Sequence, residues 1–352
     1  MECDREAQAE LSHPDSADFH VLATAHCVRG RTPKIERHSK KKGRKMSNQA
    51  NILIIGGSGH VSGAFARLAV SKGHKVWAMT RGIRPLPEGV TGIVADRFNP
   101  EQFRQAIEGS GLIWDMVVDC ICFTPEVMKL DIELFKSRTK QFVFISTDFV
   151  FDPKRRKFPQ PEDNPNYLTD DSYGAEKRRC ELLLIDSGME YTILRPCHIY
   201  GPPSELGCLP FEARDPELLN KLKAGEPITL VGGGYLLQQP IHTDDLAGVI
   251  MSVLGNEKAN KRVFQMAGPD IIESKQYYKI IADVLGVEMV EIKEHPVDLY
   301  LQEYPDYKSY ICHRIYDLRN LAEAGIYTPC ISIEDGLRTH TEYILARDAA
   351  KE

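Results

Sequence analysis

The stretch that decides the fold is residues 51–63, NILIIGGSGHVSG. Four apolar residues, 52–55, run directly into the glycine-rich segment 56–59. A short apolar run bounded by glycines predicts a strand that is buried on both faces, as in a parallel sheet. The pattern of residues 64–72 predicts a helix that follows the glycines.

The glycines of this turn predict a phosphate-binding site. They let the backbone approach a pyrophosphate closely, and the N-terminus of the next helix favours the negative charge. The spacing is Gly56-x-x-Gly59-x-x-Ser62, with Ser62 where a dinucleotide-binding turn usually carries a third glycine. Close packing of helix on strand is still expected, because Ser62 is small and Gly63 follows. On spacing alone, an ordinary strand–turn–helix without a ligand remains the alternative.

The composition describes an ordinary globular protein. The chain has 352 residues, 42% hydrophobic and 27% charged, enough for one large α/β domain or two smaller ones. A net charge of −6 gives no general reason to bind nucleic acid. We find no apolar run long enough to cross a bilayer and no secretory signal pattern. The nine cysteines lack metal-ligand spacing, so we predict a cytoplasmic protein with reduced thiols and no metal.

The rest of the chain divides into three parts. Residues 1–45 are polar, with a basic tract at 40–45, and are expected to be a disordered extension; an interaction arm or nuclear address is the alternative. Residues 46–195 are expected to form a dinucleotide-binding Rossmann domain. Residues 196–352, richer in Pro and Gly at first, are expected to form mostly a substrate-binding lobe, with some segments returning to the sheet.

Alternating strand and helix patterns specify the fold class. Strands are expected at residues 75–79, 92–95, 116–122, 141–146 and 191–194, and helices at 100–108, 125–137 and 173–187, then at 216–224, 244–254 and 274–285. This alternation predicts an α/β fold, a doubly wound parallel sheet of Rossmann type with a smaller C-terminal substrate lobe.

The segment SYGAEK, residues 172–177, contains the residues expected to carry the chemistry. Tyr173 and Lys177 are four apart, on one face of a helix. A nearby ammonium lowers the pKa of a phenol, which suits the tyrosine to acid–base work near neutral pH. The preceding strand ends in Ser146 and Thr147, at the edge of the sheet to which Tyr173 returns. A hydroxyl, a phenol and an ammonium are therefore expected to meet beside a nicotinamide.

In this order, the motifs resemble the extended or atypical short-chain dehydrogenase/reductases, the NAD-dependent epimerase/dehydratase family. The resemblance covers residues 51 to 343. It rests on GGSGHVSG at 56–63, VADR at 94–97, FIST at 144–147, YGAEK at 173–177, LRPCHIYGP at 194–202 and IHTDDLA at 241–247.

The family resemblance implies an NAD(P)-dependent epimerase, dehydratase or reductase acting on a hydroxyl/carbonyl group of a sugar or nucleotide-sugar-like substrate. Tyr173 matches the general acid/base, Thr147 the residue that hydrogen-bonds the reacting oxygen, and Lys177 the lysine that holds the ribose hydroxyls. Asp96 matches the acidic residue at the adenine. The residues expected to bind the cofactor are Gly56, Ser58, Gly59, His60, Val61, Arg81, Asp96, Cys120, Lys177 and Pro196. A homodimer is also expected, since family members are often dimers.

Departures from the family pattern weaken the nucleotide-sugar assignment. His198, after Cys197 at the nicotinamide side, stands where nucleotide-sugar enzymes commonly carry Asn. Gln238 stands where they commonly carry an arginine that clamps the diphosphate. Arg314 is the candidate to replace that charge. His242 is interpreted as a supporting residue, and Asp244 as the residue that starts a helix.

A non-catalytic function on the same fold is the alternative. Some atypical members resemble chloroplast stem-loop binding proteins, which bind RNA. In this chain, the basic runs at residues 29–45 and 154–157 would be the phosphate contacts.

The end of the second strand bears on the choice of cofactor. Neutral Thr80 stands where NAD enzymes usually place an acid that binds the ribose hydroxyls. Arg81 follows, and a guanidinium suits a 2′-phosphate. The cofactor is therefore expected to be NADP or NAD, with NADP preferred; Arg81 as a solvated turn residue is the alternative.

Overall fold

The computed structural model describes residues 49–210 and 214–351. They belong to one compact unit, Asn48–Glu352. The extension expected at residues 1–45 lies outside the described part of the chain.

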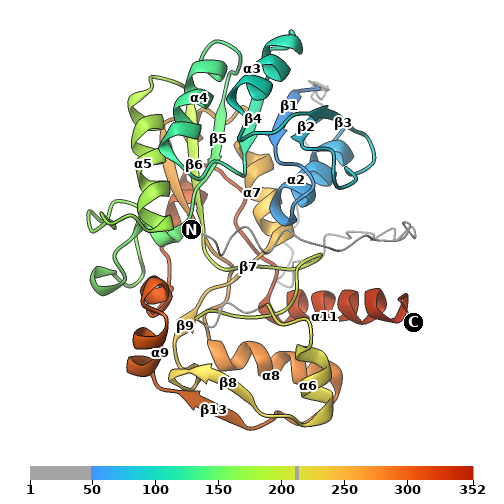
Figure 1. The fold of residues 1–352 in the computed structure, drawn as a ribbon, viewed down its shortest axis with the longest axis vertical. Helices are drawn as coiled ribbons and strands as arrows, with labels where there is room; N and C mark the ends of the chain where they lie inside the picture. The colour runs from blue at the N-terminus through green and yellow to red at the C-terminus, as the bar shows by residue number, and fades with distance from the viewer. Residues whose placement is uncertain (1–48, 211–213, 352) are drawn as a thin grey trace, which may run out of the picture. The chain divides into compact units, whose positions relative to one another are not determined.

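A seven-stranded parallel sheet forms the centre of this unit (Figure 1). The strand order is β11-β6-β5-β4-β1-β2-β3, and every neighbouring pair is parallel. The strands are β1 Asn51–Ile55, β2 Lys75–Thr80, β3 Val90–Val94, β4 Met116–Asp119, β5 Phe142–Ile145, β6 Tyr191–Pro196 and β11 Arg262–Met266. The order reverses between β1 and β4, which is where open α/β sheets bind ligands. The predicted doubly wound sheet is confirmed.

Helices cover both faces of the sheet (Figure 1). Ile52 and Ile54 of β1 face the core that α2, His60–Ser71, and α7, Thr243–Val253, close. Leu53 and Ile55 point the other way, because successive side chains of a strand alternate between faces. That second core is closed by α3 Pro100–Gly109, α4 Pro125–Phe135 and α5 Tyr173–Asp186.

A third core lies among the segments after β6. Its helices and strands are α6 Leu218–Ala224, β8 Ile228–Val231, α8 Ser274–Leu285, β13 Ile292–His295 and α11 Ile333–Ala349. Short elements connect it to the sheet: β7 Ile199–Tyr200, β9 Leu237–Gln238, β10 Ile241–His242, β12 Ile272–Glu273, α9 Val297–Glu303 and α10 Arg319–Glu323. Between them, α7 and β11 return to the sheet layers. In the described part of the chain, no helix combines the length and apolar character that crossing a membrane requires.

Candidate cofactor and active site

The turn after β1 is built by two glycines in a backbone conformation that other residues rarely adopt. The φ angles of Gly56 and Gly57 are +108° and +112°. The amide of Gly56 donates to the carbonyl of Met79, 2.9 Å away. A Cβ on Gly57 would lie 2.3 Å from the Cβ of Ala78. Glycine at both positions therefore lets the turn pass directly over β2.

Ser62, the departure from the glycine pattern, has a local function at the start of α2. Its hydroxyl oxygen accepts a hydrogen bond of 3.0 Å from the amide of Gly59, the residue that caps the helix. His60 begins α2, and its imidazole is buried. Burial lowers the pKa of His60 to about 3, so the imidazole is neutral near pH 7. A cofactor phosphate at this end of α2 would be bound by backbone N–H groups.

A cavity of about 190 Å³ lies at the carboxyl ends of β4, β5 and β6. It brings together the three residues predicted to be catalytic, Thr147, Tyr173 and Lys177, which come from separate segments of the chain. Besides Lys177, three residues predicted to contact the cofactor line the same cavity: Val61, Cys120 and Pro196. The remaining lining residues are Phe123, Ile145, Ser146, Cys197 and Ile199.

Lys177 is fully buried against the end of β5. Its ammonium donates hydrogen bonds to the carbonyl oxygens of Ile145, 2.7 Å, and Cys122, 2.9 Å. It also lies 4.3 Å from the ring centroid of Phe144. Burial lowers the pKa of Lys177 below its usual value. Because an ammonium has three N–H donors, these two carbonyls leave one donor for a ribose hydroxyl.

The two hydroxyls at the end of β5 have different partners. The Ser146 hydroxyl donates to Glu181, 2.6 Å away, and Glu181 is paired with Arg195 in the interior. Thr147 uses its oxygen to accept from the amide of Phe149, 3.2 Å away. An oxygen that accepts in this way keeps its own proton for donation. Thr147 is therefore the hydroxyl suited to bind a substrate oxygen.

Tyr173 is held beside this loop by the glycine that follows it. A Cβ on Gly174 would lie 2.0 Å from the carbonyl oxygen of Phe149, so only glycine allows α5 to begin this close. The ring of Tyr173 lies between Phe123 and Phe149, with both centroid distances 6.4 Å. The side chain is 45% exposed, which leaves it accessible to a substrate.

A second cavity, of about 410 Å³, adjoins the glycine turn on the α2 side. Gly57, Ser58 and Gly59 line it, together with Arg67 and residues 85–88 of the loop after β2. Arg67 was not predicted from the sequence as a cofactor residue, because a lone arginine in a helix carries no local signal of what it faces.

Four predicted cofactor residues lie outside both cavities: Gly56, His60, Arg81 and Asp96. Arg81 is exposed and lines neither one. Asp96 is partly buried, and its carboxylate accepts a hydrogen bond of 2.9 Å from the amide of Phe98. This hydrogen bond lies within the loop after β3, and Asp96 therefore stabilises that loop.

Arg314 is not available as a diphosphate clamp, which corrects the sequence-based suggestion. Its side chain is fully buried and forms an ion pair with Asp148, the residue after Thr147. Arg156 and the hydroxyl of Tyr316 also contact the Asp148 carboxylate. Burial alone would raise the pKa of Asp148, but the charges of Arg314 and Arg156 hold it below its usual value. Gln238 is buried as well, so neither residue offers an exposed charge to a substrate.

The residues that follow β6 are uncharged. Cys197 lines the smaller cavity, and its thiol donates to the carbonyl of Gln239, 2.9 Å away. Burial raises the pKa of Cys197 and lowers that of His198 to about 3. His242 caps α7: its Nδ1 accepts from the amide of Asp244, 3.2 Å away. The helix thus begins at Thr243, with His242 rather than Asp244 as its cap.

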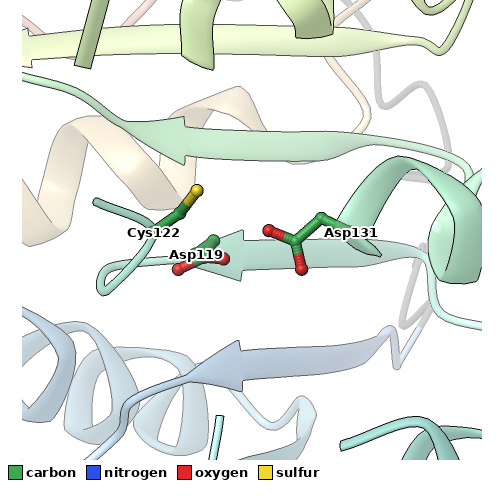
Figure 2. Close-up of side chains that lie close together, drawn as sticks. All are labelled: Asp119, Cys122 and Asp131. Atoms are coloured by element: carbon green, nitrogen blue, oxygen red, sulfur yellow. The ribbon is translucent and has the colours of Figure 1, made fainter. Parts of the chain in front are cut away.

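Asp119, Cys122 and Asp131 form a buried group whose donor atoms lie within 4.8 Å of one another (Figure 2). Arg97 supplies the positive charge between the carboxylates. Its Nη2 lies 2.5 Å from both Asp119 and Asp131, and Nη1 lies 2.8 Å from Asp131. One guanidinium therefore bridges both carboxylates and balances one negative charge, and burial raises the pKa of Asp131 above its usual value. Arg97 was not predicted as a site residue, although it is the last residue of the VADR motif.

Part of the chain matches a known protein family. Residues 126–267 match the family model described as "NAD dependent epimerase/dehydratase family". Over these residues, the match agrees with the family predicted from the motifs.

Individual relatives are distant. The chain is 27% identical over 261 residues to the chloroplast stem-loop binding protein of 41 kDa b of Arabidopsis thaliana, covering 70% of this chain and 66% of the relative. This chain thus spans about two thirds of that relative's length.

Two solved structures have the same fold. The UDP-N-acetylglucosamine 4-epimerase of Methanobrevibacter ruminantium M1, in complex with UDP-N-acetylmuramic acid, has a TM-score of 0.70 at 19% identity, covering 85% of this chain and 99% of that one. The dTDP-glucose 4,6-dehydratase of Bacillus anthracis, in complex with NAD, has a TM-score of 0.69 at 15% identity, covering 85% and 98%. At these identities the likeness shows the fold.

Proposed function

We propose that the protein is an NAD(P)-dependent epimerase, dehydratase or reductase that acts on a hydroxyl/carbonyl carbon of a sugar derivative. The observation that carries this proposal is the cavity of about 190 Å³ shared by Thr147, Tyr173 and Lys177. A hydroxyl, a phenol and a buried ammonium meet there, beside the glycine turn that suits a dinucleotide phosphate.

The three side chains have separate functions in the proposed reaction. When bound, the nicotinamide supplies or accepts the hydride. Thr147 donates a hydrogen bond from its hydroxyl group to the substrate oxygen. Tyr173 gives or takes the proton of that oxygen. Lys177 holds the ribose with its third N–H, and its positive charge favours the phenolate form of Tyr173.

NADP is the cofactor we propose, because the end of β2 and the α2 side of the glycine turn each carry an arginine that could bind its 2′-phosphate. Neutral Thr80 adds no repulsion at the end of β2, and Arg81 follows it. Arg67 lines the larger cavity with Ser58, on the α2 side of the same turn. A guanidinium binds a phosphate through charge-assisted hydrogen bonds.

The two residues considered as a diphosphate clamp offer no exposed charge, because Gln238 is neutral and buried and Arg314 is paired with Asp148. We propose a sugar derivative as the substrate. The free state of the cysteines in the described residues supports the cytoplasmic location expected from the sequence. A homodimer is also part of the proposal and rests on the family resemblance alone.

RNA binding on the same fold is the second candidate, favoured by the likeness to the stem-loop binding protein. The basic run at residues 154–157 supports it poorly. Arg156 is buried and paired with Asp148, and Arg155 pairs with Asp152. The other run, at residues 29–45, lies outside the described residues.

A screen of hydroxy sugars and their keto forms tests the proposal, with turnover followed by the absorbance of the reduced nicotinamide. Turnover of any of these substrates supports the enzyme. RNA binding that weakens steeply with salt, without turnover of any of them, supports the second candidate instead.

A further inference from the structure

The turn that follows β5 carries a buried carboxylate next to Thr147. This turn is the 3₁₀ helix η1, Asp148–Val150, and Asp148 is only 1% exposed. Thr147 precedes it, and the amide of Phe149, which follows it, donates to the Thr147 hydroxyl oxygen, 3.2 Å away. Asp148 itself lines neither of the two cavities. Any effect of its carboxylate on a substrate must therefore pass through these neighbours.

Three side chains from later segments of the chain hold Asp148. Arg314 forms an ion pair with its carboxylate, and the hydroxyl of Tyr316 donates to the same oxygen. Arg156 lies 3.2 Å from that oxygen and also donates to the backbone carbonyl of Asp148, 2.8 Å away. All three side chains are buried. Both the side chain and the backbone of Asp148 are thus held in place.

Arg314 and Tyr316, which hold the carboxylate, are anchored in turn. They lie on the stretch between α9 and α10. The amide of Arg314 donates to the carbonyl of Leu237 in β9, 2.8 Å away. The amide of Tyr316 donates to the side-chain oxygen of Gln239, just after β9, also 2.8 Å away. The turn beside Thr147 is therefore held by segments that connect the sheet to the third core.

The charge state of Asp148 favours an anchor over an acid. Burial alone would raise its pKa, but the charges of Arg314 and Arg156 hold the pKa below its usual value. The carboxylate is therefore ionised at neutral pH and has no proton to give to a substrate. A buried carboxylate is costly to separate from its guanidinium partners, so the contacts keep the turn in one geometry.

We propose that Asp148, held by Arg314, is a positioning residue that orients the hydroxyl of Thr147 toward the substrate oxygen. The proposal rests on the proposed function, because Thr147 is the residue assigned to that oxygen. A displacement of about 1 Å at a reacting group can slow a reaction about a hundredfold, so the anchoring of this turn has a kinetic consequence. The Thr147 hydroxyl then depends on an arginine that lies 166 positions after Asp148.

A double-mutant cycle tests this assignment, with turnover followed by the absorbance of the reduced nicotinamide. Asp148→Asn removes the charge that the arginines hold, and Thr147→Val removes the hydroxyl. The two changes are made singly and together. Asp131→Asn, at a buried acid of α4 that pairs with Arg97, is the matched control.

A milder variant serves where Asp148→Asn does not fold. Tyr316→Phe removes one hydrogen bond to Asp148 and leaves every charge in place. Tyr277→Phe, at a buried tyrosine of α8, is its control. Circular dichroism checks that each variant is folded at the temperature of the assay.

We expect Asp148→Asn to lower kcat at least about tenfold, while the affinity for NADPH stays unchanged. In protein that already carries Thr147→Val, the same change should lower kcat less than about threefold, because the hydroxyl that Asp148 positions is gone. Tyr316→Phe should show the same dependence on Thr147 with a smaller fall. Asp131→Asn should change kcat little in either background. An equal fall of kcat in both backgrounds, or no fall in either, overturns the proposal.

Hydrogen exchange gives a second readout that needs no reaction. In Asp148→Asn and in Tyr316→Phe, the peptide covering residues 147–151 should exchange faster, because the turn that holds the Phe149 amide against Thr147 is loosened. The two control variants should leave that peptide unchanged. Unchanged exchange in both test variants overturns the anchor. Absence of turnover in the unmodified protein would instead count against the proposed function, and the exchange measurement would still decide whether Asp148 fixes the turn.

Discussion

The ammonium nitrogen of Lys177 lies 2.7 Å from the carbonyl oxygen of Ile145, at the end of β5. Thr147 follows two residues later on that segment, and Tyr173 stands one helical turn before Lys177. This hydrogen bond therefore helps to hold the helix that carries the phenol against the strand end that carries the hydroxyl. A buried ammonium in such a position is costly unless it is hydrogen-bonded. The carbonyls of Ile145 and Cys122 supply two such hydrogen bonds.

Replacing Lys177 should affect cofactor binding and chemistry together. In Lys177→Met the ribose loses its donor, and the carbonyls of Ile145 and Cys122 lose their partner. We expect weaker cofactor binding, measured by quenching of protein fluorescence, and slower turnover. A variant in which only the rate fell would contradict the ribose contact.

The affinity for the cofactor should also depend on pH. Burial lowers the pKa of Lys177 from 10.5, and only the protonated form has a third N–H to donate. Affinity should therefore be constant at neutral pH and fall as the pH rises, at a pH below 10.5. Titration of NADPH at a series of alkaline pH values, with circular dichroism to check folding, measures this. An affinity unchanged up to pH 10.5 would contradict the role of the ammonium.

Arg81 and Arg67 should separate NADP from NAD. If either guanidinium contacts the 2′-phosphate, its replacement by alanine should weaken NADP binding about tenfold, the value of a charge-assisted hydrogen bond, and leave NAD binding unchanged. Arg319→Ala, at an exposed arginine of α10, is the matched control. Equal affinity for NADP in Arg81→Ala and the unmodified protein rules out Arg81 as the anchor, and the same result for Arg67→Ala rules out Arg67.

Removal of Arg97 should destabilise the fold. Arg97→Leu leaves the carboxylates of Asp119 and Asp131 buried without a counter-charge, which costs about 3–5 kcal/mol of unfolding free energy. Arg104→Leu, which breaks the exposed pair with Glu133, should change stability little. Urea unfolding of the two variants measures the difference. Equal unfolding free energies of Arg97→Leu and the unmodified protein would contradict this prediction.

Local pattern was sufficient to predict most of the fold. The apolar run before Gly56 identified the central strand, and the predicted helices 100–108 and 274–285 match α3 and α8 almost to the residue. The strand predicted at residues 116–122 ends at Asp119, because the Asp119 carboxylate accepts from the amide of Ile121 and turns the chain. The family motifs also identified the three residues that share the smaller cavity.

Contacts between segments that are distant in the sequence could not be predicted. Arg314 and Asp148 are 166 residues apart, and nothing local marks them as a pair. Arg156 belongs to a basic run whose sequence predicts an exposed loop, but tertiary packing buries its side chain. The specific strand β11 was not foreseen either, since its pattern, RVFQM, is only partly apolar and its place depends on pairing with β6.

The central claim is that Tyr173 moves a proton at a site that holds a nicotinamide cofactor. The most direct test is to measure turnover and NADPH affinity together in Tyr173→Phe, with Tyr343→Phe as control, using the best substrate from the hydroxy-sugar screen. We predict that turnover falls at least about a hundredfold while NADPH binds as in the unmodified protein, because only the phenol proton is lost. Full turnover in Tyr173→Phe would contradict the account.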